Sequence, residues 1–121
     1  MYARVVVSGS LDGPWKPMRL LVDTDASCTM LPRKALLALG VRPRYRQACR
    51  LGDGRKMRRD MGFVYVRYRK RVAATQVIFG EPGDASVLGV LTLEELALRL
   101  DPRSGRLREV RVLPMIPAVT A

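Results

Sequence analysis

Leu20-Leu21-Val22-Asp23-Thr24-Asp25-Ala26-Ser27 is the stretch on which the expected fold and function depend. Its apolar start is typical of a buried strand, and the aspartate, threonine and small residues after it are typical of a tight turn. The sequence contains no histidine. A carboxylate is therefore the best candidate for a catalytic group, and Asp23 is the first carboxylate that the strand delivers.

Length and composition indicate one globular domain that spans residues 1–121. Without histidine, the Ser-His and Cys-His nucleophilic systems lack their base. The common catalytic zinc sites lose their usual ligands for the same reason. We therefore expect neither a metal site nor a cofactor.

The two cysteines, Cys28 and Cys49, are too far apart in sequence to form a Cys-x-x-Cys unit. A single disulfide is possible, but small secreted scaffolds usually carry several. Free cysteine is among the most buried residue types, so two buried free thiols are the favoured interpretation.

The formal net charge of +11 raises the question of a nucleic-acid partner. The densest basic run spans residues 67–71. It alternates with the aromatic residues Tyr65 and Tyr68, whose rings could stack on bases. Outward-facing charges on a strand-turn-strand explain the run equally well. A solvated basic surface is favoured and a nucleic-acid partner is not expected. The absence of asparagine fits a thermophilic source.

No segment approaches the ~20 consecutive apolar residues of a membrane span. The first residues, Met1-Tyr2-Ala3-Arg4, lack the apolar core of a signal peptide and alternate like a strand. These features predict a cytoplasmic protein with no membrane partner.

Alternating or β-branched runs predict many short strands separated by turns. The predicted strands cover residues 4–8, 17–22, 62–68, 72–79 and 107–113, with an extended segment over 42–51. Pro32 and Gly40 bracket a short predicted helix over 35–39. A second helix is expected over 92–98, with Thr92 as its N-cap and Glu95 as the capping partner. The expected fold is mostly β, a small closed barrel with one or two short helices.

The segment around Asp23 resembles the active-site motif of retropepsin-like aspartic proteases, which reads apolar-apolar-Asp-Thr-Gly-Ala-Ser/Asp. The order of the later elements is also similar. The run 50–56 falls where the family has its flap hairpin, and Val87-Leu88-Gly89 resembles its apolar-apolar-Gly element. The resemblance covers nearly the whole chain and implies an acid-protease-type barrel of the single-domain, cellular type.

The resemblance also implies the site. Asp23 would be the catalytic carboxylate. Thr24, Asp25, Ala26 and Ser27 would form the active-site turn and lock the dimer. Leu51, Gly52, Asp53, Gly54 and Arg55 would form the flap. Met30, Val87 and Leu88 would line the substrate pocket.

The chain has one Asp-Thr motif, whereas hydrolysis by this route needs two facing carboxylates around one water. The resemblance therefore implies a homodimer with one Asp23 from each subunit, acting as an endopeptidase on an extended peptide or unfolded protein. Val90 replaces an arginine that braces viral relatives. The apolar tail over 112–119 is the candidate brace here.

Asp25 stands where the family has glycine, and it adds a side chain and a charge beside the expected pair of carboxylates. Two alternatives therefore stay open. One is an inactive or very slow protease-fold dimer that serves as a peptide-binding or assembly module. The other is a basic β-barrel that binds nucleic acid.

Overall fold

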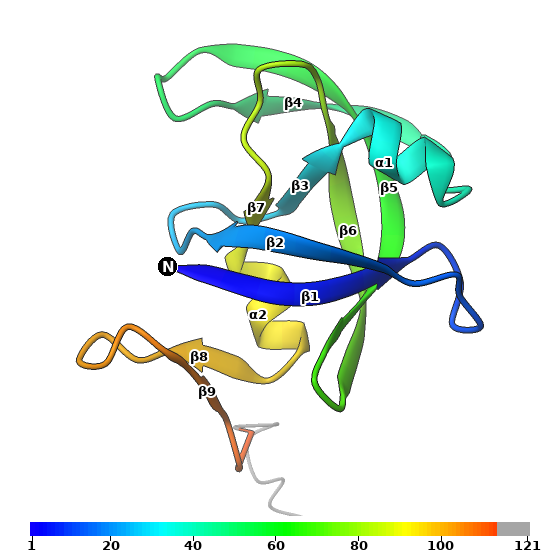
Figure 1. Cartoon of the computed structure of the whole chain (residues 1–121). Coiled ribbons are helices and arrows are strands. Elements are labelled where there is room, and N and C mark those ends of the chain that lie inside the picture. Colours follow the sequence, from blue (N-terminus) through cyan, green and yellow to red (C-terminus); the bar gives the residue numbers. More distant parts are fainter. Residues whose placement is uncertain (114–121) are drawn as a thin grey trace, which may run out of the picture.

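The computed structural model describes residues 1–113, and strands dominate it as predicted (Figure 1). The helices are short: α1 (Arg33–Ala38) and α2 (Val90–Glu95). The strands are β1 (Tyr2–Ser8), β2 (Lys16–Val22), β3 (Thr29–Pro32), β4 (Tyr45–Arg50), β5 (Lys56–Tyr68), β6 (Arg71–Gly80), β7 (Val87–Leu88), β8 (Leu98–Leu100) and β9 (Leu107–Glu109).

Seven strands form one sheet in the order β1-β2-β7-β3-β6-β5-β4, and β1 also pairs with β5. The second pairing of β1 joins the two sides of the sheet, so that six strands follow one another in a ring of pairings. β4 lies outside this ring and pairs only with the first half of β5. The remaining strands, β8 and β9, form a separate two-stranded sheet.

The ring encloses one apolar core. β5 shows how the sequence builds it, because Val64 and Val66 on one face are buried while Phe63 on the opposite face is 55% exposed. This is the alternation that the sequence predicts for residues 62–68. Leu20, Leu88 and Phe79 reach the same core from β2, β7 and β6.

The second helix differs from the prediction. It begins at Val90 with Gly89 as its N-cap, and no side chain caps it. Thr92 is fully buried inside the helix, and Glu95 accepts a hydrogen bond from Thr75 instead of closing a capping box. The predicted N-cap role of Thr92 is therefore wrong. The helix also ends earlier than expected, because Ala97 has a positive φ of 54° and the chain turns into β8.

The last predicted strand is shorter than expected. β9 covers Leu107–Glu109 rather than 107–113, and it pairs antiparallel with β8. The tail proposed to brace a dimer lies mostly outside the described residues. Over residues 1–113 no helix is long and apolar enough to cross a membrane.

Candidate functional site

The Asp23 turn, residues 23–27, lies where β2 ends and before β3 begins. Its backbone is tied on both sides. The Asp23 N–H donates to the Leu88 carbonyl at 3.1 Å, and the Ala26 N–H donates back to the Asp23 carbonyl at 3.2 Å. The short strand β7 pairs with both flanking strands, parallel to β2 and antiparallel to β3. The turn is thus fixed by one strand that contacts both of its ends.

The Asp23 carboxylate is oriented within the turn. The Asp25 N–H donates to Asp23 Oδ1 at 2.9 Å. Within residues 1–113, no group of this chain donates to Asp23 Oδ2, so one oxygen is held and the other stays available. Asp25 has no positive φ, so this turn forms without the conformational freedom of glycine.

Gly89 is the closest packing point beneath the turn. A Cβ at this position would lie 2.5 Å from the Cys28 carbonyl carbon and 2.7 Å from the Ser27 carbonyl oxygen. Two amides that follow also bond to the turn: Val90 N–H to the Ala26 carbonyl and Leu91 N–H to the Ser27 carbonyl. The glycine therefore brings the start of α2 against the turn, which is why α2 begins before Thr92.

Three buried hydroxyls run from Gly89 to the surface. The Gly89 N–H donates to Thr29 Oγ1 at 3.1 Å, Thr29 and Thr92 are 2.6 Å apart, and Thr92 and Thr75 are 2.8 Å apart. Thr75 donates to a Glu95 carboxylate oxygen at 2.8 Å. A hydroxyl has one proton, so the direction is fixed: Thr29 donates to Thr92, and Thr92 donates to Thr75. The chain satisfies all three hydroxyls beneath the turn.

The other predicted turn residues are accessible. Thr24, Asp25 and Ser27 are exposed, and Ala26 is half-buried. In a single chain these side chains face solvent.

The predicted pocket residues divide by burial. Met30 is half-buried, Val87 is 7% exposed and Leu88 is fully buried. Leu88 therefore serves the core of the single chain, and Met30 is the most accessible of the three.

A depression of about 370 Å³ lies beside the turn, at Cys28. Its other lining residues come from β5, β6 and α2: Phe63, Ala74, Thr75, Gln76, Leu91 and Glu95. Sequence reasoning missed this group because it joins residues from four distant segments. Phe63 shares a strand face with the charged Arg67, and this aromatic residue at an outward position is the one local signal that could have indicated the depression.

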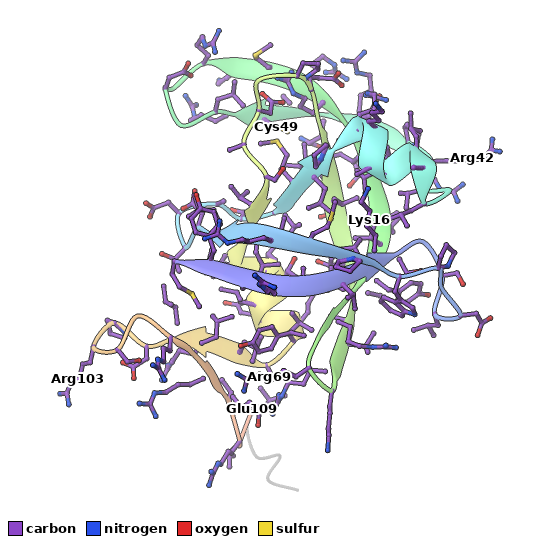
Figure 2. The ribbon with its side chains drawn as sticks, viewed as in Figure 1. Lys16, Arg42, Cys49, Arg69, Arg103 and Glu109 are labelled. Carbon is purple, nitrogen blue, oxygen red and sulfur yellow. The ribbon has the colours of Figure 1, made fainter. Side chains whose placement is uncertain are left out.

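The two cysteines are free thiols, as favoured from the sequence, although each is half-buried rather than buried. Desolvation by partial burial raises the pKa of the Cys28 thiol and also that of Cys49. Both therefore stay protonated near neutral pH, where a thiol is a weak nucleophile. Cys49 lies on the β4–β5 hairpin, the two strands and the loop between them (Figure 2).

The tip of the β4–β5 hairpin contains the residues predicted as a flap. The Leu51 N–H bonds to the Arg55 carbonyl at 2.8 Å, and Gly54 has the positive φ that the turn requires. Asp53 accepts from the Arg55 backbone N–H and its guanidinium, and these bonds hold the pKa of the Asp53 carboxyl below its usual value. The chain therefore turns back on itself within the run 50–56, where the resemblance implies a hairpin.

Ion pairs hold the hairpin at its root. Arg59 on β5 is 6% exposed and binds Asp84 in a bidentate pair, with Nε to Oδ2 at 2.9 Å and Nη2 to Oδ1 at 3.2 Å. Arg33 contacts both Asp60 and Glu81. These pairs connect the hairpin to α1 and to the loop before β7. We call these five residues the ionic anchor: Arg33, Arg59, Asp60, Glu81 and Asp84.

The Arg59 hydrogen bonds hold the pKa of the Asp84 carboxyl below its usual value, and the Glu81 backbone N–H adds to this effect. Asp84 is therefore ionised throughout the neutral range. No signal along the sequence marks this pair, because its members are 25 residues apart.

No family model matches the chain, and no curated protein matches it either. Within residues 1–113, no group of three or more Cys, Asp or Glu side chains is arranged to hold a metal ion. The chemistry that the site can support depends on the oriented carboxylate of Asp23, on an exposed turn that β7 and Gly89 hold in place.

Proposed function

We propose that the protein is a homodimeric aspartic endopeptidase in which the Asp23 carboxylates of two subunits hold one water. The observation that carries the proposal is the orientation of Asp23: the Asp25 N–H holds Oδ1, and Oδ2 accepts no hydrogen bond within residues 1–113. The packing of β7 and Gly89 against the same turn supports it, because a general base must be held in position.

The reaction requires two such carboxylates. Like charges a few ångströms apart cannot both ionise easily, so the pair shares one proton. The ionised member takes a proton from the water, which attacks the peptide carbonyl, while the protonated member donates to the carbonyl oxygen. The exposure of Thr24, Asp25 and Ser27 supports a second turn packing against the first.

The β4–β5 hairpin would act as the flap of a closed acid-protease-type barrel. Its exposed backbone edge could take an extended peptide as an added strand. The protonated state of both thiols and the lack of histidine argue against a cysteine hydrolase. No cofactor and no metal enter this mechanism.

The test is Asp23→Asn, assayed on an unfolded protein substrate. The amide keeps the shape of the turn and removes the general base, so we expect activity to fall by at least about 10³-fold. Asp12→Asn is the matched control, since Asp12 is an exposed aspartate in another turn and should leave activity unchanged.

Cleavage by Asp23→Asn at close to the wild-type rate would refute the assignment. A wild-type protein that dimerises but shows no cleavage at any pH would instead support the peptide-binding module that the charge of Asp25 suggested.

A further inference from the structure

The β4–β5 hairpin has two faces of different character. In an antiparallel pair, residues directly opposite each other share a face. One face carries Tyr45, Gln47, Cys49, Met57, Arg59 and Met61. Over the paired residues 45–50 and 56–61, the buried side chains are Arg59 and Met61. Both lie on this face, so it faces the body of the molecule.

The other face is open to solvent and strongly basic. Its three cross-strand pairs are Arg46–Asp60, Ala48–Arg58 and Arg50–Lys56. All members except Asp60 are exposed. We call the four cations Arg46, Arg50, Lys56 and Arg58 the outer basic face.

Most of this charge is not neutralised within the chain. Asp60 is the one acid on the face, and it is shared between Arg33 and, at 3.7 Å, Arg46. Within residues 1–113, the side chains of Arg50, Lys56 and Arg58 have no acidic partner. The face therefore presents at least three free positive charges on a ribbon exposed along its length.

Two of the four cations in the basic run at 67–71 contact other parts of the fold. Arg67 stacks on Trp15 at 4.2 Å, and Arg71 donates to the Leu96 and Ala97 carbonyls and pairs with Glu109. Arg69 and Lys70 are exposed in the turn. The outer basic face differs from this run because its cations lie side by side on one face of a two-stranded ribbon.

We propose that the outer basic face binds the phosphate backbone of duplex nucleic acid. A two-stranded ribbon is narrow enough to enter the ~12 Å major groove of B-DNA. Successive pairs on one face are about 7 Å apart, which matches the rise of two phosphate steps measured along the helix axis of the duplex. Three of the four cations are arginines, whose planar fork suits phosphate oxygens.

An acidic protein fits this face less well. Protein interfaces have an apolar or aromatic centre from which charged residues are depleted. On the solvent side of the hairpin, Ala48 is the one apolar side chain among these cations. Binding would therefore come almost entirely from charge and counterion release, which is how proteins bind nucleic acid.

The experiment measures binding of a fluorescent DNA duplex by anisotropy across a salt series. The test variant carries Arg50→Gln, Lys56→Gln and Arg58→Gln. The matched control carries Arg99→Gln, Arg103→Gln and Arg106→Gln on the β8–β9 hairpin. That hairpin is at the opposite end of the molecule, with Arg103 near its tip (Figures 1 and 2). Both variants remove three charges from exposed positions, and circular dichroism confirms that each is folded.

We expect the test variant to bind about 10²-fold more weakly at 0.1 M salt. The slope of log K against log salt should become shallower by about 3, since each lost phosphate contact removes about 0.9. The control should change affinity by less than about threefold. Equal losses in both variants, or no duplex binding by the wild type, would overturn the proposal. Polyglutamate that binds as tightly as a duplex of equal charge would also overturn it, in favour of an acidic protein partner.

The Asp23→Asn variant separates this proposal from the proposed peptidase function, because it keeps the whole hairpin and removes only the expected general base. Binding of the duplex by Asp23→Asn with wild-type affinity, together with loss of cleavage, would show that the two functions depend on different residues.

Discussion

The Asp23 turn and the β4–β5 hairpin are the two parts of the proposed active site, and they are stabilised in opposite ways. The turn is held by backbone hydrogen bonds and by close packing against Gly89. The hairpin is exposed on most of its surface and is fixed at its root by the ionic anchor. The position of the expected catalytic group therefore depends on packing, whereas the position of the expected flap depends on charge and hence on pH.

The largest effect on stability should follow from a methyl group added beneath the turn. Gly89→Ala would place its Cβ 2.5 Å from the Cys28 backbone, so one of the two segments must move. We expect the free energy of unfolding to fall by about 3 kcal/mol. Urea titration followed by circular dichroism measures this change.

Gly52→Ala is the matched control in the hairpin. Gly52 has ordinary backbone geometry and no atom within 4 Å of an added Cβ. The free energy of unfolding of Gly52→Ala should equal that of the wild type or exceed it by up to about 1 kcal/mol. Similar losses at both glycines would contradict the difference between the two regions.

The second prediction concerns the root of the hairpin. Asp84→Asn keeps the volume of the side chain but removes the charge that Arg59 binds, and the free energy of unfolding at pH 7 should fall by about 2 kcal/mol. The folded pKa of Asp84 is lowered, so its contribution is complete above the unfolded value of about 3.9. The contribution is lost as the pH falls through the lowered folded pKa.

Denaturant titrations of wild type and Asp84→Asn between pH 2 and 7 check this prediction. The two stabilities should converge at the acid end. Asp53→Asn at the exposed tip of the same hairpin provides the comparison and should show no measurable change. A difference between wild type and Asp84→Asn that stays constant down to pH 2 would show that the charge of Asp84 is not what anchors the hairpin.

The smallest effect is expected at Asp25. Because its backbone does not have a positive φ, glycine gains nothing in the folded turn and adds entropy to the unfolded chain. Asp25→Gly should lower stability by about 0.5–1 kcal/mol. It should nevertheless raise peptidase activity, because it removes a negative charge beside the pair of carboxylates and makes room for substrate. Lower activity at every pH would mean that Asp25 is a working part of the site.

Local signals in the sequence were enough to predict most strands, the Asp23 turn and the hairpin tip. β-branched alternation and glycine-containing turns act within a few residues, so they can be recognised without the fold. The prediction failed at Thr92 because a capping signal competed with the need to pack Gly89 against Cys28, and the tertiary contact prevailed.

Other features have no local signal. The ionic anchor joins residues that are far apart in the sequence, and so do the three hydrogen-bonded threonines, Thr29, Thr75 and Thr92. The bonded residues are between 17 and 63 positions apart. The pairing of β5 with β1, which closes the ring, likewise joins residues far apart in the sequence. The separation of the hairpin into an inner and a basic outer face depended on the register of β4 with β5, which composition does not specify.

Subunit mixing tests directly whether one active site needs Asp23 from two subunits. Equal amounts of wild type and Asp23→Asn are unfolded, refolded together and assayed for peptidase activity. Random pairing leaves half of the wild-type subunits in mixed dimers, so activity per wild-type subunit should fall to about half. Refolding with an equal mass of an unrelated protein should leave activity unchanged. If Asp23→Asn has no more effect than that control, the active site belongs to a single chain and the account is contradicted.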